Sequence, residues 1–127
     1  DKNNTDSQTA TGEIVWNNTV LDNPAGSYNN TSGRFTAPVA GVYYFAFYVL
    51  KRGTSYIRLG FLLNGAQYIQ NQIYQQNASG AEEMAHASII MSLSAGDYVS
   101  VTIGAVGGGN IYGGGNMHNG FLGYLIG

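Results

Sequence analysis

The side chains that could carry acid–base or nucleophilic chemistry are few in this sequence. The 127 residues include seven carboxylates and two histidines, and they contain no cysteine. Such chemistry needs titratable groups that converge on one pocket. Glu82 and Glu83 are adjacent, so in a strand they would point to opposite faces and could not pair as the acid and base of a glycosidase within one subunit. Neither His86 nor His118 is accompanied by a Gly-x-Ser-x-Gly motif. We therefore predict that the chain is not an enzyme and has no catalytic residues.

A glycine-rich run covers residues 107–115, where bare backbone amides could bind a phosphate. The run has neither Gly-x-Gly-x-x-Gly nor a terminal Gly-Lys-Ser/Thr, and no helical pattern follows it. We interpret the run as a surface loop rather than a nucleotide site. Asn110 and Tyr112 are its candidate contact residues, since Tyr offers a large contact area at a low entropy cost.

Three of the five basic residues, Lys51, Arg52 and Arg58, lie close together in the sequence. They could bind an anionic partner, or they could form an ordinary solvated turn. Asn77 begins an Asn-x-Ser sequon in another loop-like stretch. We expect ligand contacts from loops 51–56, 76–81 and 107–118. The candidate ligand-binding residues are Lys51, Arg52, Tyr56, Asn77, Asn110 and Tyr112.

Composition excludes several classes of partner. The formal net charge is -2 with only 5 Lys or Arg, so the basic surface that nucleic-acid binding requires is missing. No apolar run approaches the roughly 20 residues that cross a bilayer, so we expect no membrane insertion. The absence of cysteine excludes a disulfide framework and leaves the redox compartment open.

The distribution of glycines and aromatic residues predicts an all-β domain. The chain has 19 Gly and 10 Tyr, and strand-like stretches recur about every 8 to 12 residues, which is typical of a sandwich or jelly roll. Asn64-Gly65 is the strongest hairpin signal, and Asp22 and Asp97 lie in turns where Asp caps its own backbone. Residues 1–12 are expected to form a lead-in with a possible first edge strand, and 13–127 the domain. The expected strands cover residues 13–21, 34–37, 42–50, 56–63, 66–75, 83–93, 98–106 and 120–126.

Residues 42–50 alternate in a way that leaves both faces of one strand apolar. Tyr43, Phe45 and Phe47 share one face, whereas Tyr44 and Tyr48 share the other. A strand in a small sandwich has only one core face, so the second could meet another subunit. Alternatively, tyrosines simply cover a sheet that faces water. The residues expected to pack in the core or in a trimer are Tyr43, Phe45, Phe47, Phe121, Tyr124 and Leu125.

The spacing of the aromatic residues resembles that of the globular-head family of complement C1q, within the C1q and tumour-necrosis-factor jelly-roll group. The family pattern is an aromatic, six residues, Phe, five residues, and Gly-x-Tyr-x-Phe-x-Phe. It matches Tyr28, Phe35 and the stretch 41–47. Residues 93–99 resemble the family's Leu-x-x-Gly-Asp turn, and residues 121–126 its closing strand. The matches run in order from about residue 16 to the C-terminus.

This resemblance implies a two-sheet antiparallel jelly-roll sandwich of about ten strands that forms a compact homotrimer. Members of the family usually carry a collagen-like or coiled-coil stalk before the head, and no stalk sequence appears among these residues, so the resemblance leaves the presence of a stalk open. Some members of the family bind calcium through acidic residues, and Glu83 is the one candidate ligand at such a position. Gln75 and Gln76 replace the other acidic pair, and neutral amides attract a hard cation far less than carboxylates do. We therefore expect no cofactor, with calcium as the alternative if three symmetry copies of Glu83 or His86 converge on one ion.

Two functions remain open at this point. The first is a non-enzymatic trimeric binding head that recognises an extracellular protein or glycan through its end loops. The alternative is the structural or receptor-binding tip of a virion fibre or of a spore or cell-surface filament. Both place the domain outside the cell, on a cell surface or on a virion.

Overall fold

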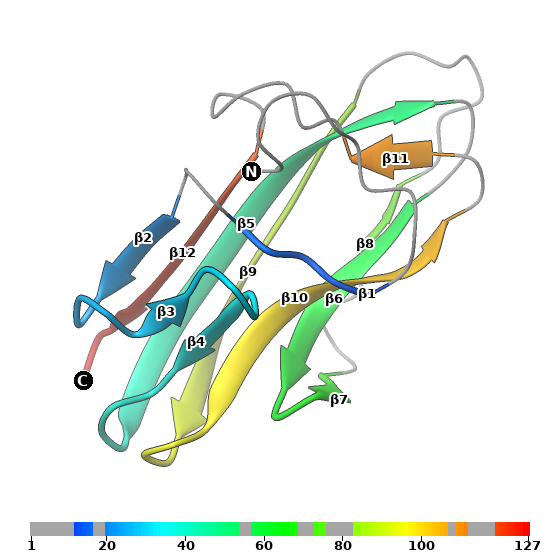
Figure 1. Cartoon of the computed structure of the whole chain (residues 1–127). Coiled ribbons are helices and arrows are strands. Elements are labelled where there is room, and N and C mark those ends of the chain that lie inside the picture. The colour runs from blue at the N-terminus through cyan, green and yellow to red at the C-terminus, as the bar shows by residue number, and fades with distance from the viewer. Residues whose placement is uncertain are drawn as a thin grey trace.

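The computed structural model describes residues 12–16, 20–53, 57–68, 73–75, 83–106, 109–111 and 119–127. These residues form the strands β1 to β12, which lie in one sheet of seven strands and one of five (Figure 1). The described part of the chain contains no helix of the length and apolarity that a membrane crossing requires. The prediction of an all-β, two-sheet fold is confirmed.

The seven-stranded sheet has the order β3-β4-β10-β6-β7, with β1 also pairing with β10 and β8 with β6. All of its pairs are antiparallel. Its strands are β1 (Gly12–Glu13), β3 (Tyr28–Asn29), β4 (Arg34–Thr36), β6 (Ile57–Leu63), β7 (Ala66–Gln67), β8 (Ile73–Gln75) and β10 (Tyr98–Val106).

The five-stranded sheet is built around its longest strand, β5. It has the order β11-β5-β12-β2, and β9 pairs with the other side of β5. Its strands are β2 (Val20–Asn23), β5 (Gly41–Gly53), β9 (Glu83–Leu93), β11 (Gly109–Ile111) and β12 (Gly120–Leu125). The β2–β12 pair is parallel, unlike the expected antiparallel arrangement. Nearly the whole chain separates these two strands, so no hairpin forces them to run in opposite directions.

The core lies between the two sheets and is centred on the inner face of β5. Tyr43, Phe45 and Phe47 are buried there, as the alternation predicts, and Phe121 of β12 is 3% exposed beside them. The Phe35 ring of β4 packs edge-on against Phe45 at 5.1 Å between ring centroids. Phe45 therefore contacts aromatic rings from both sheets, on β4 and on β12.

Gly123 lets the aromatic rings approach β12. A Cβ atom at this position would lie 2.7 Å from the Phe45 ring and 3.0 Å from the Phe35 ring. Either ring would have to move before any side chain could be accommodated. The glycine in the closing strand is thus required by core packing rather than by a turn.

Two turns follow the chemistry that their residues predict. Asn64 and Gly65 have φ values of 51° and 81°, as the tight hairpin between β6 and β7 needs. The Asp97 carboxylate accepts hydrogen bonds from the Ser94 N–H at 2.8 Å and from Asn64 Nδ2 at 3.0 Å. The hydrogen bonds from Asn64 and Ser94 lower the pKa of Asp97. Asp22 likewise accepts from the N–H groups of its own turn.

Four expected boundaries were wrong. The expected strand 13–21 is divided, because residues 14–16 lie outside any strand between β1 and β2. Residues 51–53 are not loop, because β5 continues to Gly53 and pairs there with β11. The glycine-rich run is not entirely a loop, since β11 lies within it. The expected strand 66–75 is divided into β7 and β8. In each case the partner strand, which local sequence does not reveal, determines where backbone pairing ends.

Phe45→Ala should lower the free energy of unfolding by about 3 to 5 kcal/mol, because it empties the site of a fully buried ring between the sheets. Urea unfolding at equilibrium would measure the change. Thr36→Ala, at an exposed position of β4, is the control and should cost far less. Equal stability of the Phe45 variant and the wild type would contradict the assignment of this ring to the core.

Candidate assembly face and loop end

The face of the five-stranded sheet that points away from the core carries apolar side chains. Leu21, Ile90 and Met84 are 62%, 58% and 47% exposed, and Tyr44 and Tyr48 lie half-buried between them on β5. We call this surface the outer face. Its described residues are Leu21, Tyr44, Ala46, Tyr48, Met84, His86, Ser88, Ile90, Leu122 and Tyr124.

A groove of about 510 Å³ is hollowed into the outer face. Ala46 of β5 stands opposite Ser88 of β9, so two small side chains lie side by side in its lining. The Tyr48 ring lies over Gly120, where a Cβ atom would be 2.7 Å from a ring carbon. The groove is lined by Leu21, Tyr44, Ala46, Phe47, Tyr48, His86, Ala87, Ser88, Gly120, Phe121 and Leu122.

The residues that define the outer face include no acidic or basic side chain other than His86. None of these side chains is Asp, Glu, Lys or Arg. His86 is exposed, lines the groove and lies opposite Tyr48 in the β5–β9 register. The arrangement is suited to contact with another apolar surface, since charged residues are depleted at the centres of interfaces.

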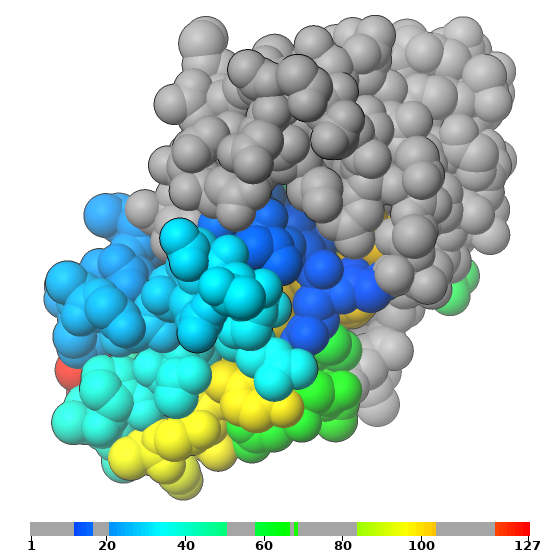
Figure 2. Space-filling view, in the orientation of Figure 1, coloured from blue at the N-terminus to red at the C-terminus, as the bar shows by residue number. Residues whose placement is uncertain are grey.

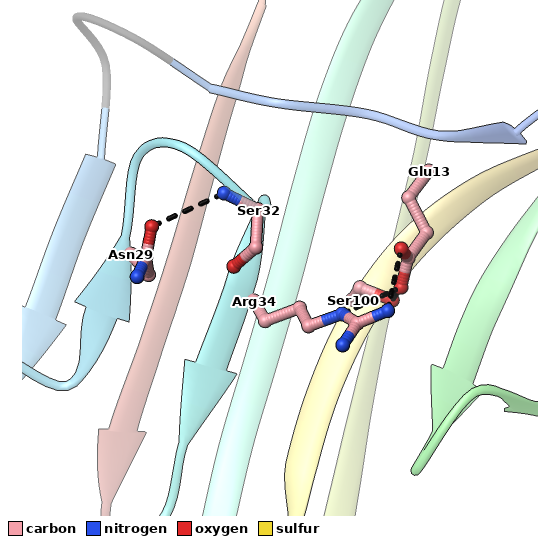
Figure 3. A network of polar contacts seen from close by, with 5 residues as sticks. All are labelled: Glu13, Asn29, Ser32, Arg34 and Ser100. Atoms are coloured by element: carbon pink, nitrogen blue, oxygen red, sulfur yellow. Dashed lines mark hydrogen bonds and ion pairs between the residues drawn. The ribbon is translucent and has the colours of Figure 1, made fainter.

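The seven-stranded sheet carries a charged group on its own solvent side (Figure 3). The Glu13 carboxylate accepts hydrogen bonds from Arg34 Nε at 3.2 Å and Nη2 at 3.1 Å, and from the Ser100 hydroxyl at 2.7 Å. The Arg34 guanidinium lies 4.5 Å from the centre of the Tyr98 ring. These contacts attach β1 to β4 and β10, and Figure 2 shows the blue segment 12–16 between the cyan β3–β4 hairpin and green β6.

The Glu13 carboxylate is stabilised in its ionised form. Partial burial raises the pKa of Glu13, but the hydrogen bonds from Arg34 and Ser100 and the charge of Arg34 outweigh this effect, so the pKa is lowered. The ion pair is only partly exposed on both sides, with the two side chains 39% and 24% accessible. The two sheets thus differ in chemistry. The seven-stranded sheet carries the cluster of Glu13, Arg34 and Ser100, which we call the polar clip. The five-stranded sheet carries the outer face, which has no Asp, Glu, Lys or Arg among its defining residues.

The structure brings together the backbones of three predicted ligand-binding residues. Arg52 stands opposite Asn110, and Lys51 stands opposite Ile111 on one side and Glu83 on the other. These positions lie at the end of β5 far from the C-terminus (Figure 1). The adjoining strands β6 and β8 also pair there, with Ile57 opposite Gln75. The described residues that flank positions 54–56, 76–82 and 112–118 therefore lie at one end of the sandwich.

The remaining predicted site residues fall outside what the structure describes. Tyr56, Asn77 and Tyr112 lie outside the described residues, and only the backbone is described at Lys51, Arg52, Asn110 and Glu83. A binding role for the six candidates, and calcium binding by Glu83, stay predictions. Within the described ranges, no group of three His, Cys, Asp or Glu side chains could hold a metal ion.

Sequence reasoning named Tyr44 and Tyr48 as second-face residues but missed the part that His86 plays in the groove. The alternation of residues 83–93, with its even positions outward, was the signal that could have found it. The Glu13–Arg34 pair was also missed. Its members are separated by 21 residues, and no local pattern links them.

Comparison with known proteins agrees with this architecture. Residues 2–126 match the C1q domain. The mouse (Mus musculus) collagen alpha-1(X) chain is 29% identical over 107 residues, which is 84% of this chain and 15% of that one. The chain therefore spans a small part of this relative. The globular domain of zebrafish complement 1qA superimposes with a TM-score of 0.65 at 23% identity, covering 94% of this chain and 90% of that one. Murine APRIL gives a TM-score of 0.64 at 15% identity, over 94% and 91%.

The two solved structures show that the fold is a jelly-roll sandwich. Because the family match covers nearly the whole sequence, the chain belongs to the C1q domain family. The resemblance inferred from the aromatic spacing is confirmed.

Glu13→Gln should lower the free energy of unfolding at pH 7 by about 1 kcal/mol, because the neutral amide loses the ion pair while Ser100 and Arg34 keep weaker hydrogen bonds. A carboxyl whose pKa is lowered in the folded state contributes stability above its ordinary value of 4.5, and this stability is lost as pH falls through the folded-state pKa. Urea unfolding should therefore give stabilities of the variant and the wild type that converge as pH falls below 4.5.

Glu82→Gln removes the same charge and serves as the control for net charge. If the Glu13 variant lost equal stability at pH 7 and pH 3, the ion pair would not be its cause.

Proposed function

We propose that this domain is the non-enzymatic head of an extracellular protein, that it assembles as a homotrimer through the outer face, and that it binds a protein or glycan through the loops at one end. The observation that carries this proposal is the uncharged, grooved outer face on one sheet of a sandwich whose other sheet is polar outside. Membership of the C1q domain family supports the same conclusion.

Exposing this apolar area to water is unfavourable in free energy for an isolated chain. Leu21, Ile90 and Met84 are each about half exposed or more on one sheet, together with the half-buried Leu122 and two tyrosines. Contiguous apolar patches of this type mark interaction sites. A second copy supplies a surface of the same composition, and stable interfaces bury on the order of 1,200 Å² or more. The Tyr44–Tyr124 pair, with ring centroids 5.3 Å apart, offers a rigid aromatic surface for that contact.

Assembly would make binding at the loop end multivalent. The strand ends that carry the three loops lie together, so a trimer presents three equivalent sets of loops. Linked copies convert weak single contacts into strong avidity. Lys51 and Arg52 are consecutive basic residues at this end, and they favour an anionic partner such as a sulfated glycan.

The match to a collagen chain favours a head carried by a longer protein. The alternative of a virion-fibre or filament tip would use the same trimer, with the loops serving attachment. The groove offers no acid–base pair among its described lining residues, which supports binding rather than catalysis.

The mass of the purified domain tests assembly. Light scattering after gel filtration should give about three times the 13.5 kDa chain mass for the wild type. Leu122→Lys places a charge in the groove and should give single chains at micromolar concentration, because burying an unpaired ammonium group outweighs the gain from apolar contact. Thr36→Lys adds the same charge at an exposed position of the other sheet and should stay trimeric. A wild-type mass equal to that of one chain would contradict the proposal that the domain forms a trimer.

Binding to immobilised heparin, an anionic glycan, tests the loop end. The Lys51→Ala/Arg52→Ala double variant should bind at least about tenfold more weakly than the wild type, since the loss is repeated in each of three linked sites. Lys2→Ala removes one positive charge elsewhere in the sequence and is the control. Equal retention of the double variant and the wild type would exclude these residues as an anion-binding site.

A further inference from the structure

We propose that His86 makes the assembly sensitive to pH, so that the trimer holds at neutral pH and separates into folded single chains in mildly acidic solution. This inference rests on the proposed function, because it concerns the regulation of the same outer face. It names the residue that responds to pH and predicts that assembly weakens as pH falls.

His86 lies within the apolar surface rather than at its rim. It stands on β9 directly opposite Tyr48 of β5 and lines the groove with Leu21 and Leu122 of the two strands beyond. The imidazole is exposed in the single chain. A copy seated on the groove would therefore take this side chain out of water.

The groups around His86 provide no described counter-ion for an imidazolium. The titratable side chains of the outer face that come from neighbouring strands are Tyr44 and Tyr48 of β5 and Tyr124 of β12. On β2, the Asp22 carboxylate is engaged by the N–H groups of Gly26 and Tyr28, each at 3.0 Å.

The other charged residues on the strands of this sheet lie at the loop end. They are Lys51 and Arg52 of β5 and Glu83 of β9, which occupy the far end of the β5–β9 ladder. Tyr74 is the titratable residue of β8, the remaining strand that packs against β9, and β11 has none.

Covering the groove would thus favour the neutral imidazole. A buried cation without a partner is strongly disfavoured, whereas a neutral imidazole can be buried with its ring against Tyr48. Histidine is the side chain that takes up a proton between about pH 8 and pH 5. A subunit that has taken up this proton must release it to assemble, so association weakens as pH falls, and three copies make the response steep.

The fold itself should survive the same change in pH. The pKa values of Glu13 and Asp97 are both lowered, so their ion pair and turn hydrogen bonds persist at pH 5. The expected product of acidification is therefore a folded single chain rather than an unfolded one.

Sedimentation equilibrium at pH 7.5 and pH 5.0, with circular dichroism to monitor folding, tests the proposal. For the wild type, the protein concentration at half-assembly should rise at least about tenfold at pH 5.0. His86→Gln keeps a polar, neutral side chain and should change by less than about twofold. His118→Gln, at the only other histidine in the sequence, is the matched control and should respond like the wild type. His86→Lys, with a fixed charge, should fail to assemble at either pH.

The outcomes separate this inference from the assembly proposal. A wild type that is a single chain at pH 7.5 contradicts the trimer itself. A trimer equally stable at both pH values, or a His86→Gln variant that still dissociates at pH 5.0, overturns the role of His86 and leaves the trimer standing. If His86→Gln does not assemble at pH 7.5, His86→Phe provides a second neutral replacement to which the same criterion applies.

Discussion

The structure depends on the alternation of aromatic side chains along β5. The inward rings of Tyr43, Phe45 and Phe47 fill the space between the sheets, and the outward rings of Tyr44 and Tyr48 shape the groove. Both sets of rings require glycine on the adjacent strand β12. Gly123 leaves room for the Phe45 ring and Gly120 for the Tyr48 ring, so one strand accommodates rings on both of its faces.

The two sheets separate the tasks of the domain. The seven-stranded sheet directs polar groups outward, and the clip of Glu13, Arg34 and Ser100 attaches β1 to it. A partly exposed ion pair contributes little stability, yet its two hydrogen bonds and the one from Ser100 fix where the chain enters the sheet. The five-stranded sheet directs uncharged rings and aliphatic side chains outward. Exposure to water is therefore more favourable for the solvent side of the seven-stranded sheet than for the outer face of the five-stranded sheet.

The sequence predicted what depends on local periodicity. The alternation of residues 42–50, the Asn64-Gly65 hairpin and the strands over 83–93 and 98–106 all match the structure. Features that depend on a distant partner were not predictable. The extension of β5 to Gly53 needs β11, and the β2–β12 pairing joins opposite ends of the chain. The groove was partly anticipated from Tyr44 and Tyr48, but its shape depends on small residues of three strands.

The same alternation couples the fold to assembly. Successive residues of a strand face opposite sides, so a shift of one residue in β5 would exchange its core rings for its outer rings. The core would then receive Tyr44 and Tyr48, whose hydroxyls need partners, while the phenylalanines would face water or a neighbour. Tyr43 avoids this conflict because its hydroxyl donates to the Val39 carbonyl at 2.7 Å, at the edge of the core. The register that satisfies the core is thus also the one that creates the outer face, and neither can change without the other.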